Sequence, residues 1–66
     1  MNAKEIDRAY PHDSVKQGAF ENAIDCLVFG MGKKYWKDMK WDMELPKEES
    51  DAVWTRAFYY VAEGTL

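Results

Sequence analysis

The sequence predicts an all-α domain: a small bundle of three main helices, with room for a short fourth helix at the N-terminus. Apolar residues recur at the 3.6-residue spacing of a helix in three stretches of the chain. Helix-capping residues precede these stretches, and glycine or proline follows them. The chain has 66 residues and contains no repeat, low-complexity tract or linker, so residues 1–66 are expected to form one small helical domain.

The first expected helix is short. Asn2 can cap it, with Glu5 in the capping-box position three residues later. Pro11 ends it, because a proline disfavours helical backbone in the residue before it.

The second expected helix has clearer boundaries. Ser14 is its predicted N-cap, Gln17 its capping-box partner and Gly30 its stop. Apolar residues fill one half of the helical wheel, as in a helix packed on one side. Val28 and Phe29 break this division and make the last turn apolar nearly all round, so we expect that turn to be enclosed.

The third expected helix runs from about Lys33 to Asp42 or Glu44, after a tight turn in which Gly30 and Gly32 bracket Met31. One side of its wheel is the predicted core side and carries Trp36, Met39 and Met43. The other side carries most of the basic residues of this stretch, namely Lys33, Lys34, Lys37 and Lys40. Trp41 projects among these lysines, where their alkyl stems either screen it or leave it presented to a partner. The alternative is that Trp41 packs under another segment of this chain, because tryptophan is usually highly buried.

The fourth expected helix begins with Pro46 as its first residue, or later with Ser50 as its cap, and ends at Gly64. Both starts place acidic residues at the positive end of the helix dipole. The predicted core combines the apolar sides of the three main helices: Phe20, Ile24, Leu27, Trp36, Met39, Met43, Val53, Trp54, Ala57, Phe58 and Val61.

The composition limits how such a small chain is stabilised. Cys26 is the only cysteine and His12 the only histidine, so no disulfide forms within the chain and no zinc cluster is available. A chain of this length buries only about 60% of its unfolded surface, and it carries 47% apolar residues. We therefore expect help from a homo-oligomer or from a larger protein partner.

Neither a membrane span nor a secretory signal is recognisable, because no apolar run approaches 18 residues and the N-terminus lacks an apolar segment. The expected location is the cytoplasm, which agrees with a single unpaired cysteine. The net charge of −3 is unevenly distributed, with a basic stretch at 33–40 and an acidic one at 41–51.

Three groups of residues are candidate chemical sites, and none is favoured. His12 and Asp13 are an imaginable acid/base pair without a nucleophile, and a histidine after a proline is more often simply exposed. Cys26 lies on an apolar helix side and is expected in the core. The acidic run after residue 41 lacks the spacing of a calcium loop and is interpreted as a solvated helix start, with imitation of phosphates as the alternative. No catalytic residue, cofactor or metal site is predicted.

The glycine turn between the second and third helices resembles a helix-turn-helix DNA reader over about 20 residues. In this resemblance Lys33, Lys34 and Lys37 would contact a phosphate backbone. Against it, Asp25 falls where an apolar residue is usual, and the expected reading helix has no Arg, Asn or Gln for base edges. A nucleic-acid-binding protein is therefore the alternative function.

The favoured function is a small non-enzymatic protein-binding module. In size and composition the chain resembles small inhibitors and adaptors encoded by phages and mobile elements, including anti-restriction and anti-CRISPR proteins. The expected partner is a larger protein; a nucleic acid is less favoured, and an enzymatic role comes last. The predicted binding surface joins lysines and aromatic residues, namely Lys33, Lys34, Lys37, Lys40, Trp41 and Tyr59.

Two tryptophan substitutions separate core from surface. Trp36→Ala should lower the free energy of unfolding by about 3 kcal/mol or more, as the loss of a buried aromatic does. Trp41→Ala should leave the melting temperature nearly unchanged and abolish partner binding. Thermal unfolding followed by circular dichroism makes the comparison. If Trp41→Ala destabilises the protein as strongly as Trp36→Ala, Trp41 belongs to the core.

Overall fold

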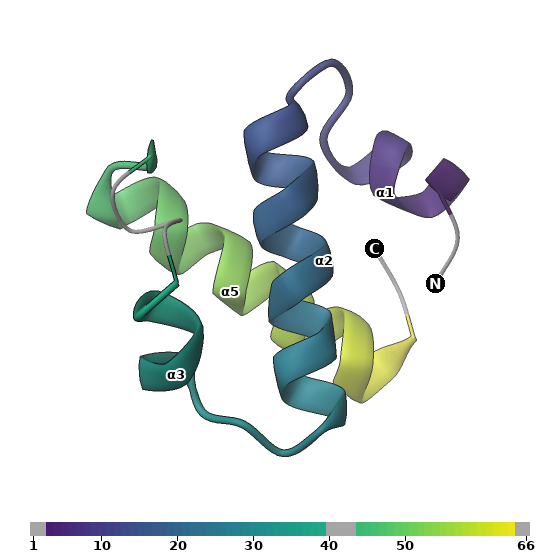
Figure 1. Cartoon of the computed structure of the whole chain (residues 1–66). Helices are drawn as coiled ribbons and strands as arrows, with labels where there is room; N and C mark the ends of the chain where they lie inside the picture. Colours follow the sequence, from purple (N-terminus) through teal and green to yellow (C-terminus); the bar gives the residue numbers. More distant parts are fainter. Residues whose placement is uncertain (1–2, 40–43, 65–66) are drawn as a thin grey trace.

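The computed structural model describes residues 3–39 and 44–64, and within these ranges the chain forms helices and no strand. With the labels of Figure 1, the helices are α1 (Ala3–Ala9), α2 (Ser14–Val28), α3 (Lys33–Lys37) and α5 (Lys47–Glu63). The predicted all-α class is confirmed. Instead of three main helices, the described part contains two long helices and two short ones.

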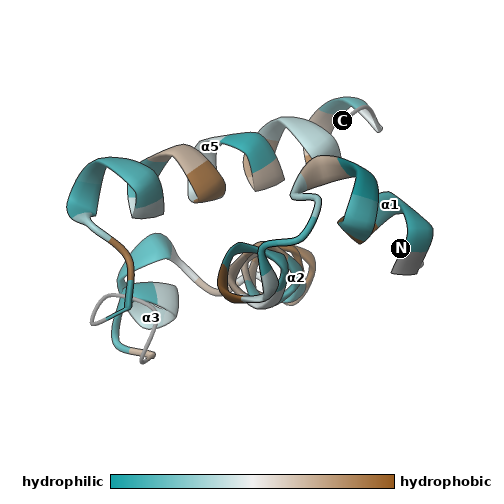
Figure 2. Ribbon diagram, turned by 90° about the horizontal axis from the view of Figure 1, so that it is seen from above, coloured by the Kyte–Doolittle hydropathy of each residue, from teal (hydrophilic) through white to brown (hydrophobic). Residues whose placement is uncertain are grey.

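The helices lie in two layers. Seen from above in Figure 2, α5 runs across one layer, and α2 appears end-on in the other with α3 beside it. The two long helices cross, and their contact is the largest between any two described elements. The short helices lie on opposite sides of this crossing, α1 near the end of α5 and α3 near its beginning (Figure 1).

The core lies where α2 and α5 face each other. Its buried apolar residues are Ala9, Ala19, Phe20, Ala23, Ile24, Cys26, Trp36, Leu45, Val53 and Ala57. Three further predicted core residues, Leu27, Met39 and Trp54, are partly buried and pack against this cluster. Small residues such as Ala19, Ala23 and Ala57 are fully buried, which allows the two long helices to approach closely.

The core prediction is wrong for two residues, since Phe58 is 51% exposed and Val61 is 41% exposed. Both lie on the side of α5 that also carries Trp54, one or two turns further along the helix. The described contacts of α3 with α5 are those of Trp36 with Trp54 and of Lys33 and Lys37 with Asp51, all in the first half of α5, before Phe58 and Val61. Met43, the remaining predicted core residue, lies outside the described residues, as does the predicted cap Asn2.

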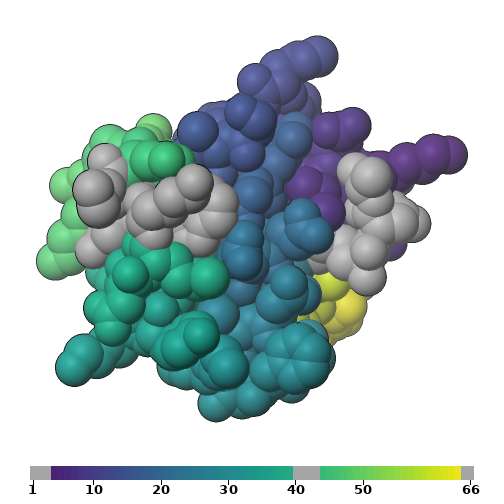
Figure 3. Space-filling view, viewed as in Figure 1, coloured from purple at the N-terminus to yellow at the C-terminus, as the bar shows by residue number. Residues whose placement is uncertain are grey.

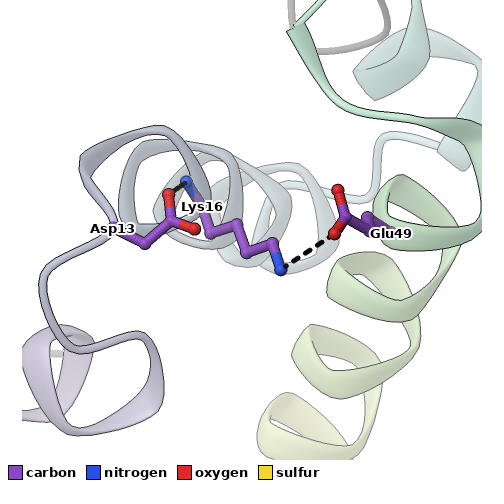
Figure 4. A network of polar contacts seen from close by, with 3 residues as sticks. All are labelled: Asp13, Lys16 and Glu49. Carbon is purple, nitrogen blue, oxygen red and sulfur yellow. Dashed lines mark hydrogen bonds and ion pairs between the residues drawn. The ribbon is translucent and has the colours of Figure 1, made fainter.

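Asp13, and not Ser14, is the N-cap of α2. Its Oδ1 accepts a hydrogen bond of 3.0 Å from the backbone N–H of Lys16, and Ser14 becomes the first helical residue. The Lys16 Nζ lies 3.5 Å from Glu49 Oε1, so the beginnings of α2 and α5 are joined (Figure 4). Because the side chain of Glu49 is about half exposed, this ion pair orients the helices more than it stabilises them.

The predicted capping-box partner Gln17 has a different role, which is to hold α1. Its Nε2 donates to the backbone oxygen of Tyr10 at 2.8 Å and to Asp7 Oδ1 at 2.9 Å. From α5, Arg56 Nη1 donates to the backbone oxygen of Ala9 at 3.0 Å. These bonds satisfy carbonyl groups that the end of α1 leaves without helical partners. As predicted, the helix ends before Pro11.

The ends of α5 follow the expected chemistry with one shift. Pro46 has extended backbone angles and precedes the first helical residue, Lys47. Gly64 ends the helix with a φ of 73°, and its N–H donates to the backbone oxygen of Tyr60, as predicted. The alternative start at Ser50 is wrong, because Ser50 lies within the helix and is fully buried.

Ser50 provides a test of the α2–α5 packing. Its side chain is fully buried, and its Oγ has no hydrogen-bond partner among the described residues. A buried hydroxyl without a partner costs about 1–3 kcal/mol of desolvation, and alanine is also the better helix former. Ser50→Ala should therefore raise the free energy of unfolding by about 1 kcal/mol in urea titrations.

Ser14→Ala is the matched control, because Ser14 is exposed and its hydroxyl is not the cap. Its effect should stay within about 0.5 kcal/mol. A loss of stability in Ser50→Ala would show that the hydroxyl is satisfied and contributes to the packing.

Candidate partner-binding surface

Trp36 fixes the position of α3. Its side chain is fully buried, and its indole Nε1 donates a hydrogen bond of 3.1 Å to the backbone oxygen of Ala19 in α2. Its ring lies against Trp54 of α5, with a distance of 5.3 Å between ring centroids. One side chain of α3 therefore contacts both long helices, and the opposite side of α3 must face away from them.

Two lysines of α3 are turned toward α5. Lys33 Nζ lies 2.9 Å and Lys37 Nζ 3.0 Å from the same oxygen, Oδ1 of Asp51. Hydrogen bonds from these two ammonium groups lower the pKa of Asp51 to about 2. The pairs anchor α3 at both ends to the second turn of α5, and they neutralise part of the positive charge of α3.

Lys34 and Tyr35 lie on the side of α3 that faces away from the core. Both are exposed, and Tyr35 retains about half of its surface. Lys34 lies two positions, or about 200° around the helix, from the buried Trp36. Lys34 makes no ion pair with another described residue. It is therefore the lysine of α3 that is presented to solvent.

The end of α2 exposes apolar side chains that the sequence predicted to be enclosed. Val28 is 63% exposed and Phe29 is 74% exposed, so this prediction is wrong. The reason is the stop of the helix: Gly30 takes a φ of 77°, and the N–H of Met31 donates to the backbone oxygen of Cys26. This turn leads the chain away from α2 before another element covers its last turn.

Met31, in the segment between α2 and α3, is also exposed. Four large apolar side chains thus lie exposed within eight consecutive residues. Figure 3 shows the end of α2, this segment and α3 along one edge of the molecule. We call this the connector surface and define it by Val28, Phe29, Met31, Lys34 and Tyr35.

The structure brings together only part of the predicted binding site. Lys33, Lys34 and Lys37 share the five-residue helix α3, but only Lys34 points away from α5. Lys40 and Trp41 lie outside the described residues. Tyr59 is exposed on α5 next to Phe58, with ring centroids 6.0 Å apart, and lies about 12 Å along the helix from Asp51. Tyr59 therefore stands apart from the connector surface.

The residues considered for catalysis are held in structural or solvent-exposed positions. His12 is exposed with a φ of 60°, in the turn that leads to α2, and the side chain of Asp13 accepts from Lys16 as a helix cap. Cys26 is buried as predicted, and its burial raises the pKa of its thiol, which lowers the fraction of reactive thiolate.

The acidic run around the start of α5 is partly paired with lysines, through Glu49 and Asp51. Within residues 3–39 and 44–64 no three His, Cys, Asp or Glu side chains come together in a metal-binding arrangement. No helix in this part of the chain is long and apolar enough to cross a membrane.

Comparisons of the chain with protein-family models, with curated proteins and with solved structures returned no match.

The contact of α3 with Asp51 predicts a dependence of stability on acid pH. The pKa of Asp51 in the folded protein is about 2, below the ordinary value of about 3.9. A carboxyl group whose pKa is lower in the folded state stabilises the fold fully at pH values above its pKa in the unfolded state. This stabilisation is lost as the pH falls through the pKa of the folded state. The free energy of unfolding of the wild type should exceed that of Asp51→Asn by a constant amount above about pH 4, and less toward about pH 2.

Urea unfolding followed by tryptophan fluorescence measures this difference. Added salt should reduce it, because the pairs are partly exposed. A difference that does not change with pH would contradict the assignment of the two lysines to Asp51.

Proposed function

We propose that this protein is a small non-enzymatic binding module, of the inhibitor or adaptor type, that binds a larger protein through its connector surface. The observation that carries the proposal is the exposure of four large apolar side chains within residues 28–35. Isolated exposed apolar residues are ordinary, but a concentration of them in one segment is typical of interaction sites.

The chemistry of the connector surface suits a protein partner. Aromatic residues and methionine are enriched in protein interfaces, where aromatics often supply most of the binding energy. Phe29 is the most exposed large apolar residue of the described chain and is the expected anchor. Lys34 adds a cation beside Tyr35, so the partner is expected to offer an apolar pocket bordered by carboxylates.

Lys40 and Trp41 remain part of the proposal, because they lie within four residues of the end of α3 in the sequence. Tyr59 is proposed as a separate contact on α5, since it is exposed beside Phe58. A resemblance to phage-encoded inhibitors remains one of size and composition.

Nucleic-acid binding, the alternative, has less support. Lys33 and Lys37, which would contact phosphates, share Asp51 as their partner. The phosphate backbone of a nucleic acid near these lysines would also be repelled by the carboxylate of Asp51. The net charge of −3 adds to this repulsion.

The test compares capture of a partner by the wild type and by surface variants. The tagged chain is incubated with lysate of the cells from which the sequence derives, and the retained proteins are identified by mass spectrometry and then purified. Phe29→Ser should weaken binding to the purified partner by about tenfold or more in calorimetry, because a buried aromatic anchor is lost. Lys34→Glu should mainly slow association.

Val61→Ser is the control, since Val61 is also an exposed apolar residue but lies on α5, about 200° around the helix from Tyr59. It should leave the affinity within about twofold. Equal losses in Val61→Ser and Phe29→Ser, or retention of duplex DNA in place of a protein, would contradict the proposal.

A further inference from the structure

We propose that, in the absence of another partner, the connector surface is covered by the connector surface of a second copy of this chain, in a twofold dimer. The inference concerns the free protein, so it does not depend on the proposed function. It follows from the charge pattern of α3, from the exposed apolar residues beside it and from the area that a dimer needs.

The outward side of α3 carries one positive and one negative residue. Lys34 and Asp38 are four positions apart, which places them on the same side of the helix. Asp38 follows α3 as its C-cap with helical backbone angles, and both side chains are exposed. Neither makes an ion pair with another described residue.

This pattern is complementary to itself. In a twofold contact, residue i of one copy meets residue j of the other, and residue j meets residue i. Two antiparallel copies of α3 would therefore place each Lys34 opposite the partner's Asp38, with Tyr35 beside the axis. Antiparallel pairing also opposes the dipoles of the two short helices.

Asp51 reduces the electrostatic obstacle to this pairing. Without it, α3 would carry three lysines against Asp38, and two copies would repel each other. Asp51 lowers the net charge of this group from +2 to +1, and the remaining excess lies on Lys33 and Lys37, which are turned toward α5. The outward side then carries one charge of each sign, on Lys34 and Asp38.

A dimer interface would need only a small part of the surface of the chain. The chain exposes 4430 Å², and a standard interface buries about 800 Å² on each partner, less than a fifth of this surface. From the usual size of aromatic side chains, Phe29 and Tyr35 together would contribute roughly 250 Å². Val28, Met31, Lys34 and Asp38 lie in the same segment and would extend the contact.

Sedimentation analysis of the chain alone, from about 1 µM to about 1 mM, tests the dimer. We expect a reversible monomer–dimer equilibrium. Phe29→Ser should raise its dissociation constant about tenfold or more. Phe58→Ser, the matched control, should change it by less than about twofold.

Charge reversal tests the orientation. Lys34→Asp and Asp38→Lys should each weaken the dimer about tenfold, because like charges then meet at both contacts. An equimolar mixture of these two variants should form a heterodimer close to wild-type strength, since every contact again joins opposite charges. Circular dichroism and melting temperature establish whether each variant is folded. If Phe29→Ser does not fold, the charge variants alone test the proposed dimer contact.

A monomer at about 1 mM overturns the inference, as does a mixture that associates no better than its components. Dissociation by Phe58→Ser in place of Phe29→Ser would place the contact elsewhere and overturns it too. Because no other protein is present, failure here is distinct from failure of the proposed function, which is measured with the purified partner.

Discussion

The contacts of Trp36 determine how α3 is placed against the two long helices. The indole is fully buried, donates to the backbone of α2 through Ala19 and lies against Trp54 of α5. A helix of five residues cannot be stable alone, because helix nucleation is costly, so α3 depends on this contact. The same contact decides which residues of α3 face outward, and it makes the exposure of Lys34 and Tyr35 a consequence of core packing.

Polar contacts add to the stability that the small apolar core provides. On one side of the long helices, Gln17 and Arg56 donate to the last carbonyl groups of α1, and Tyr60 donates to Glu5. On the other side, Asp51 receives two lysines of α3. Both short helices are thus held by side chains of the long ones. This arrangement agrees with a chain of 66 residues, whose apolar burial alone would give only marginal stability.

Sequence periodicity was sufficient for the fold class and for most of the core, including Phe20, Trp36 and Val53, because these depend on which side of each helix is apolar. It failed where the outcome depends on the position of a neighbouring element. Phe58 is exposed, and the described contacts of α3 with α5 lie before it, at Asp51 and Trp54, which no local pattern revealed. The exposure of Val28 and Phe29 has a visible signal in the sequence, because both residues break the apolar and polar division of the helical wheel. Such a break fits an enclosed turn and fits exposed apolar side chains equally well. The pairing of Asp51 with α3 joins distant positions and had no local sequence signal.

The role of Asp51 connects the packing of this protein with the kind of partner it suits. A cluster of three lysines on a short helix would attract any polyanion and repel a second copy of itself. By pairing with two of them, Asp51 offsets one of the three positive charges, and the side of α3 that faces away from α5 is left with Lys34 and the exposed ring of Tyr35. In the proposed protein complex, binding energy would come mainly from apolar burial, with Lys34 contributing orientation and association rate. The carboxylate that holds α3 against α5 therefore also supports the proposal of a protein, and not a nucleic acid, as the partner of the connector surface.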